Sequence, residues 1–146
     1  MDLSGFSINY VAVFVAAIAA WIVGYLWYTV IFVGMWRKLM GVTPEMVAAH
    51  KAQGKSMMPM MVIYFLSAFV MADVMAYNVW IWKAGDFMMA LQVAFWLWLG
   101  FSMTTRLDQA VMDMDKNKNG WKLFALDSGY RLVAMIVCAA VLAMWK

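Results

Sequence analysis

Residues 3–36 read LSGFSINYVAVFVAAIAAWIVGYLWYTVIFVGMW, a run that contains no charged side chain. A helix needs about 20 mainly apolar residues to cross a hydrocarbon core of about 30 Å, so this stretch is long enough to span a membrane. Three later stretches meet the same requirement. We therefore predict four transmembrane helices, at about residues 9–35, 59–82, 87–110 and 121–145.

The composition agrees with a membrane protein. Of 146 residues, 67% are hydrophobic and 13% are charged, whereas an average soluble domain is roughly 45–50% apolar and 25% charged. This apolar content excludes a disordered chain, and the single cysteine, Cys138, excludes a disulfide scaffold. The sequence predicts an all-α membrane protein over residues 1–146, with four transmembrane helices forming one up-down bundle.

Lysine and arginine in the short connections predict the orientation. Seven of them lie in the connections between spans 1 and 2 and between spans 3 and 4, and two lie on the other side, Lys83 and Lys146. We expect both basic connections in the cytoplasm and both termini in the periplasm of a bacterial inner membrane. Membrane lipids are then the surrounding partners, and the net charge of +3 is no signal for nucleic acid.

Only the connection between spans 1 and 2 has room for structure of its own. Thr43-Pro44-Glu45 is typical of a helix start, with a capping hydroxyl, a proline at the first position and an acid in the first turn. We expect a short interfacial helix at about residues 44–53. It carries His50, the only histidine, and a lone loop histidine predicts no metal site.

The connection between spans 3 and 4 imitates the opening of a calcium loop, with Asp115, Asn117, Asn119 and Gly120. The twelfth position of such a loop should be a bidentate glutamate, and it is Leu126 here. We therefore predict a polar turn and no bound calcium. With one cysteine, one histidine and short loops, we expect neither a cofactor nor an enzyme activity.

A small residue recurs at every fourth position of the first span, at Ala12, Ala16, Ala20 and Gly24. Helices do not associate through hydrophobicity within lipid, so close packing across small residues becomes a main source of association. This stripe predicts a helix-packing face. The spacing leaves open whether the partner is another helix of the chain or a neighbouring subunit.

The charged residues Asp73, Arg106, Asp127 and Arg131 fall inside the predicted spans. Each isolated charge would cost about 2.5–3.5 kcal/mol at the centre of a membrane helix on insertion scales. Depths counted along the helices match for Arg106 and Asp127, and Arg131 follows Asp127 by one turn. We predict one polar cluster joining the second, third and fourth spans, with Ser102, Gln109 and Tyr130 available to complete its hydrogen bonds.

Several stretches resemble a known family. The first span carries Gly24-Tyr25-Leu26-Trp27-Tyr28 followed by Phe32, Gly34 and Trp36, and later stretches carry Gly100-Phe101, Thr104-Thr105, Leu123-Phe124 and Gly129-Tyr130. Together they resemble the bacterial membrane family called domain of unknown function 1761. The family's usual Ser-Pro is Thr29-Val30 here, and its Phe-Gly pair is split by Val33. The resemblance implies a four-helix inner-membrane protein without an established activity.

Two functional interpretations follow from the charged residues. Because two acids and two guanidinium groups balance, a closed ion-pair network is favoured, and with it an accessory or structural subunit that forms a homo-oligomer or joins other membrane subunits. The alternative is a small oligomeric transporter or channel that uses Asp73, the least certainly paired acid, to couple proton or ion movement to transport.

Overall fold

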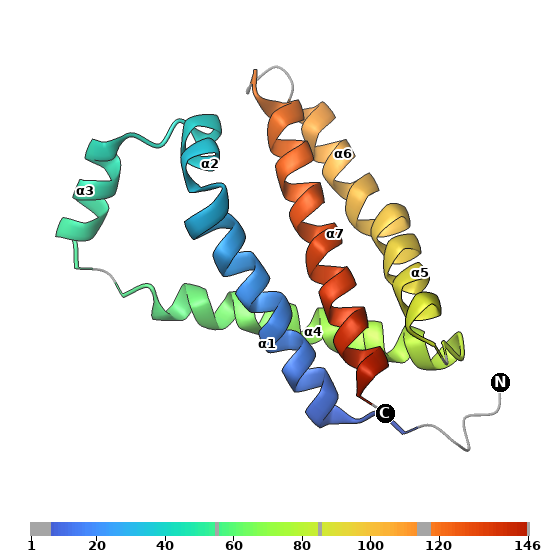
Figure 1. The fold of residues 1–146 in the computed structure, drawn as a ribbon. Coiled ribbons are helices and arrows are strands. Elements are labelled where there is room, and N and C mark those ends of the chain that lie inside the picture. Colours follow the sequence, from blue (N-terminus) through green and yellow to red (C-terminus); the bar gives the residue numbers. More distant parts are fainter. Residues whose placement is uncertain (1–6, 55, 85, 114–117, 146) are drawn as a thin grey trace.

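The computed structural model describes residues 7–54, 56–84, 86–113 and 118–145, and all regular structure in these ranges is helical (Figure 1). The elements follow in this order: α1 (Tyr10–Leu26), η1 (Trp27–Ile31), α2 (Val33–Met40), α3 (Pro44–Ala52), α4 (Met58–Ile81), α5 (Phe87–Leu97), η2 (Trp98–Met103), α6 (Thr104–Met112) and α7 (Gly120–Met144). The two η elements are π-helical turns inside longer helices.

Four helices are long and apolar enough to cross a membrane: Tyr10–Ile31, Met58–Ile81, Phe87–Met112 and Gly120–Met144. They pack together, and α2 and α3 lie between the first and the second of them. The predicted fold class is therefore confirmed: an all-helical protein with four transmembrane-like helices and a short helix in the first connection.

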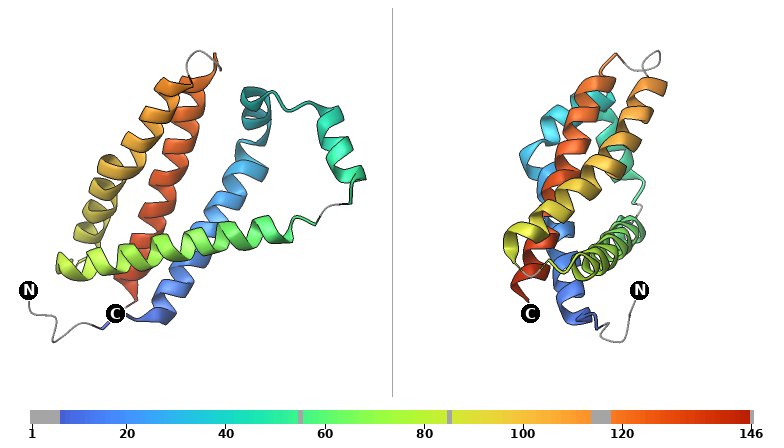
Figure 2. Two further views of the ribbon diagram at one scale, coloured as in Figure 1. Left: turned by 180° about the vertical axis from the view of Figure 1, so that it is seen from behind. Right: turned by 90° about the vertical axis from the view of Figure 1, so that its right-hand side faces the viewer.

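The helix α7 is central, since it packs against α1, α4, α5 and α6. The start of α1 and the end of α7 lie at one end of the molecule, and α2 lies at the other end with the start of α7 (Figure 1). The helix α4 crosses α1 and α7 steeply instead of running alongside them, and the side view agrees, because α4 is seen there strongly foreshortened (Figure 2). The four long helices are therefore not all parallel, because α4 lies across the others.

Small side chains form the core where these helices meet. The buried residues are mostly alanines, together with Val13, Met75, Val93, Met135 and Cys138. Alanine lets helix backbones approach closely, and van der Waals packing of this kind is what holds helices together in lipid. The large apolar side chains are correspondingly displaced outward, and many of them are exposed on the helix surfaces.

Local sequence signals account for the helix ends. The helix α3 begins at Pro44, as the capping pattern predicts, and the Thr43 hydroxyl accepts a hydrogen bond from the Met46 N–H at 3.3 Å. The Asp86 carboxylate caps α5 by accepting from the Met89 N–H at 2.7 Å. The helix α2 ends at Met40. The next residue, Gly41, has a φ of +67°, which is the left-handed conformation that glycine adopts without strain.

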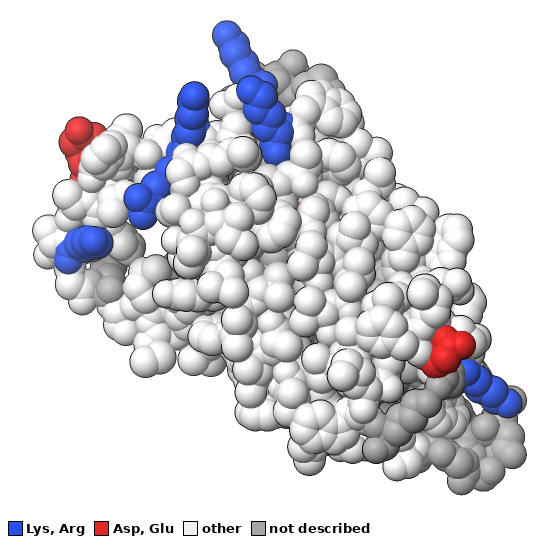
Figure 3. Space-filling model, viewed as in Figure 1, with Lys and Arg blue, Asp and Glu red and all other residues white. Residues whose placement is uncertain are grey.

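On the face shown in Figure 3, charged side chains lie toward the two ends of the molecule, and a broad uncharged band lies between them. Arg37 and Lys38 lie in the last turn of α2, and Lys122 lies in the first turn of α7, so both basic connections share one end. Several residues of the sequence patterns lie outside the described residues: Lys55, Lys116 and Lys146 of the charge pattern, and Asp115 and Asn117 of the calcium-loop pattern.

Candidate functional site: a charged and aromatic centre around Asp127

Asp127 on α7 connects three segments of the chain. Its Oδ1 accepts a hydrogen bond from the Tyr28 hydroxyl at 2.6 Å, and its Oδ2 lies 3.6 Å from Nη1 of Arg106. The Asp127 side chain is 22% exposed and that of Arg106 is 35% exposed. Tyr28 belongs to η1 and Arg106 to α6, so one carboxylate joins the first, third and fourth long helices.

Arg106 is held from its own helix as well. Its Nη1 donates a hydrogen bond at 3.0 Å to the side-chain oxygen of Gln109, three residues later. A charge in a membrane helix is tolerated where other polar groups share it. The guanidinium therefore lies between a carboxylate on α7 and an amide on α6.

An aromatic layer surrounds this polar centre. The Tyr130 ring meets the Tyr28 ring edge-on with a centroid distance of 5.2 Å, and the Trp27 ring lies at 6.5 Å from Tyr130. Trp36 packs against Tyr28 at 6.3 Å, and Phe32 packs against Trp27 at 4.6 Å. Such pairs add about 0.5–1.5 kcal/mol each beyond the area they bury. The aromatic residues therefore fix the position from which Tyr28 reaches Asp127.

Gly24 allows this close packing, and a second glycine, Gly129, lies beside it. A Cβ at Gly24 would lie 2.8 Å from the Tyr130 hydroxyl oxygen, so only glycine leaves room for that ring. A Cβ at Gly129 would lie 3.6 Å from the Trp27 ring, which is an ordinary contact. The Gly-Tyr-Leu-Trp-Tyr stretch of the first span and the Gly-Tyr pair of the last one are thus two sides of a single interface.

The two π-helical turns adjoin this centre. Tyr28 lies within η1, and η2 leads directly into α6, which carries Arg106. Threonine hydroxyls donate to carbonyls one turn earlier, Thr29 to Tyr25 at 2.6 Å and Thr105 to Phe101 at 2.6 Å. π-helical turns are rare and appear frequently at functional sites. Neither turn was predicted from the sequence. Thr29 and Thr105 were a signal for them, because threonine hydroxyls that bond to a carbonyl one turn earlier often bend a helix.

The structure pairs two of the four charged residues for which we predicted one polar cluster. Among the described residues, Arg106–Asp127 is the one ion pair that involves any of them. Arg131 places its guanidinium over the ring of Tyr130, 5.5 Å from the centroid. Asp73 lies on α4, which crosses the other helices, so depth counted along that helix does not translate into depth in the bundle.

The expected hydrogen-bonding partners are also distributed differently. Gln109 binds Arg106, but the Ser102 hydroxyl points to the sulfur of Met135 at 3.6 Å, and Tyr130 contributes its ring. Tyr28, which was not predicted as a partner, makes the shortest of these contacts, at 2.6 Å from Asp127. Asp73 keeps a buried Oδ1 that has no hydrogen-bond partner within the described part of the chain.

The small-residue stripe of the first span packs inside the chain. Ala12, Ala16 and Ala20 are each at most 2% exposed, and α1 packs against α4 and α7. Gly24 continues the same face against Tyr130. The partners that the spacing left open are therefore helices of the same chain. In the described ranges, no group of three or more His, Cys, Asp or Glu residues is placed to hold a metal ion.

The comparisons with known proteins identify a family and no individual relative. The sequence model of the family described as "protein of unknown function (DUF1761)" matches residues 11–143, and this range includes Tyr28, Arg106, Asp127 and Tyr130. Neither the curated proteins nor the solved structures give a match. The match covers nearly the whole chain and agrees with the four-helix architecture, so this protein belongs to the DUF1761 family.

Proposed function

We propose that this protein is a non-enzymatic subunit of a bacterial inner membrane, with both termini in the periplasm, and that it acts as an accessory or structural component. It associates through exposed helix faces with copies of itself or with a larger membrane complex. The observation that carries this proposal is the pairing of Asp127 with both Tyr28 and Arg106. Both carboxylate oxygens of Asp127 face side chains of other helices, which is what a structural connection between helices requires.

The surface of α4 supports the association. Ile63, Leu66, Val70 and Val74 are exposed, and their spacing of three and four residues places them along one side of the helix. The opposite side of α4 packs against α1 and α7 through Ala72 and Met75. In lipid an apolar side of this kind needs no cover, but it allows another helix to replace lipid by packing.

The assembly state tests this proposal directly. Extraction in a mild detergent followed by native mass spectrometry is expected to give a stoichiometric assembly, either of this chain alone or with further membrane subunits. A bulky residue in the association surface, Val70→Trp, is expected to raise the fraction of single chains at least tenfold, because the ring prevents close packing of helices.

Val111→Trp is the matched control, since Val111 is exposed on α6, away from α4, and its replacement should leave the assembly unchanged. Single chains at every protein concentration, in all three proteins, would contradict the proposal.

One observation favours a second candidate function, that of a proton- or ion-coupled transporter. The buried Oδ1 of Asp73 has no hydrogen-bond partner among the described residues, unlike either oxygen of Asp127, each of which faces a polar partner. A polar atom buried without a partner is costly, and ionisable groups within membrane helices mark ion and substrate pathways. Asp73 is therefore the group that such a transporter would use.

Proton flux in proteoliposomes distinguishes this candidate. If the protein transports protons, vesicles that contain it should dissipate a pH gradient faster than protein-free vesicles, and Asp73→Asn should return the rate to that of protein-free vesicles. The control is Asp108→Asn on the exposed side of α6, which should keep the faster rate. If Asp73→Asn changes only stability or association, the transporter candidate fails and the result supports the structural role.

A further inference from the structure

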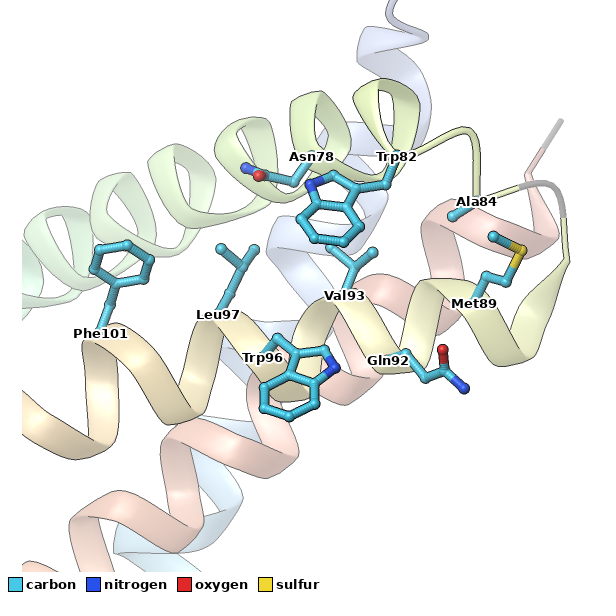
Figure 4. Close-up of a pocket in the computed structure, with 9 residues that line it drawn as sticks. All are labelled: Asn78, Trp82, Ala84, Met89, Gln92, Val93, Trp96, Leu97 and Phe101. Carbon is cyan, nitrogen blue, oxygen red and sulfur yellow. The ribbon is translucent and has the colours of Figure 1, made fainter.

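A groove runs between the end of α4 and the helix α5 (Figure 4). Its volume is about 240 Å³, and residues of both helices and of the short connection between them line it. Val93, Leu97 and Phe101 follow one another at every fourth position and point from α5 and η2 toward α4 (Figure 4). The Trp82 ring points back from the end of α4 over Val93 (Figure 4). The floor of the groove is therefore apolar along its whole length.

The length of the groove matches one leaflet of a bilayer. From Met89 to Phe101 the helix advances by twelve residues, which is about 18 Å at about 1.5 Å per residue. Half of a hydrocarbon core is about 15 Å. The groove begins beside the connection that holds Ala84, at one end of the molecule, and it runs toward the middle of the bundle. It is thus placed and sized for a chain that enters from one membrane surface.

The polarity of the groove changes along this length. The carboxamide of Gln92 on α5 lies in the half nearer the connection, and Leu97 and Phe101 make up the floor of the deeper half, where Asn78 on α4 lies level with Leu97 (Figure 4). None of the described residues that line the groove is charged. An aromatic ring such as Trp82 near the end of a span is typical of the membrane interface. The lining therefore suits a ligand with a neutral polar group at its outer end and a hydrocarbon chain below it.

We propose that this groove binds one acyl chain of a phospholipid, with the ester group beside Gln92 and the chain end beside Phe101. The Gln92 amide supplies N–H donors for an ester carbonyl, and the apolar side chains contact the chain. A compact water-soluble ligand is disfavoured, because pockets for such ligands enclose about 300–1,000 Å³ and this groove is smaller and open on one side.

Photo-crosslinking lipids test the site and its direction. The full chain is reconstituted in vesicles of phosphatidylethanolamine and phosphatidylglycerol that contain a trace of phosphatidylcholine with a diazirine on one acyl chain. With the diazirine at the chain end, adducts at Leu97 and Phe101 should exceed those at the exposed α1 residues Val11 and Ile22, which lie outside the proposed association surface, at least fivefold. With the diazirine next to the ester, the excess should move to the region of Gln92.

A groove-filling variant supplies the control. Leu97→Trp is expected to reduce the excess labelling of Phe101 to the level of Ile22, and Val62→Trp on the exposed side of α4 is expected to leave it unchanged. Equal labelling of the groove and of Ile22 in the unmodified protein would show bulk lipid only and overturn the proposal. Labelling at the same residues by both probes would also overturn it, because the chain would then have no fixed direction.

Discussion

Replacement of Asp127 by leucine is expected to lower the free energy of unfolding by about 2 kcal/mol, between the loss of about 0–1 kcal/mol for an exposed ion pair and about 3–5 kcal/mol for a buried one. The intermediate value applies because the Asp127 and Arg106 side chains are 22% and 35% exposed. The substitution leaves the guanidinium of Arg106 without its carboxylate and the Tyr28 hydroxyl without its acceptor. Unfolding in mixed micelles, followed by tryptophan fluorescence, measures the loss.

Two further variants separate this pairing from a general effect of losing a charge. Asp108→Leu removes an exposed acid of α6 and is expected to change stability by less than about 0.5 kcal/mol. The double variant Asp127→Leu with Arg106→Met should be more stable than Asp127→Leu alone, because no uncompensated charge is left. If Asp127→Leu and Asp108→Leu behave alike, Asp127 does not tie the helices together.

Replacement of Gly24 by alanine is expected to cost about 1–3 kcal/mol, the usual range for overpacking a filled interior. The new methyl group would lie 2.8 Å from the hydroxyl oxygen of Tyr130 and 3.1 Å from its ring. That ring is confined by Tyr28 and Trp27, so it cannot move aside freely. The same unfolding experiment measures the loss, and weaker attachment of Tyr28 to Asp127 should accompany it.

The chain offers a matched control in another helical glycine. A Cβ at Gly34, in α2, would meet nothing within 4 Å. Gly34→Ala is therefore expected to leave stability unchanged or to raise it by about 0.5–1 kcal/mol, since alanine restricts the unfolded chain more than glycine does. In the Gly24→Ala background, Tyr130→Phe should recover part of the loss by removing the nearest atom. Equal effects of Gly24→Ala and Gly34→Ala would refute the packing role of Gly24.

The nearness of Arg106 to Asp127 could be predicted from residue positions, but the closest partner of Asp127, Tyr28, could not. Counting along the third and fourth spans placed Arg106 and Asp127 at matching depths, and Nη1 of Arg106 lies 3.6 Å from Oδ2 of Asp127. Counting does not extend to Asp73, because it assumes that helices run parallel and α4 crosses its neighbours. It also missed Tyr28, whose position depends on the π-helical turn η1 and on aromatic packing against Tyr130.

The number of spans, their approximate limits and the start of α3 at Pro44 are determined by local sequence, because membrane crossing and helix capping depend on neighbouring residues alone. The crossing of α4, the pairing of Tyr28 with Asp127 and the groove beside α5 were decided by tertiary structure. In lipid, apolar side chains give helices little preference for one orientation over another. The fit of Ala, Gly and aromatic side chains between helices therefore selects the arrangement, and that fit exists only once the helices have met.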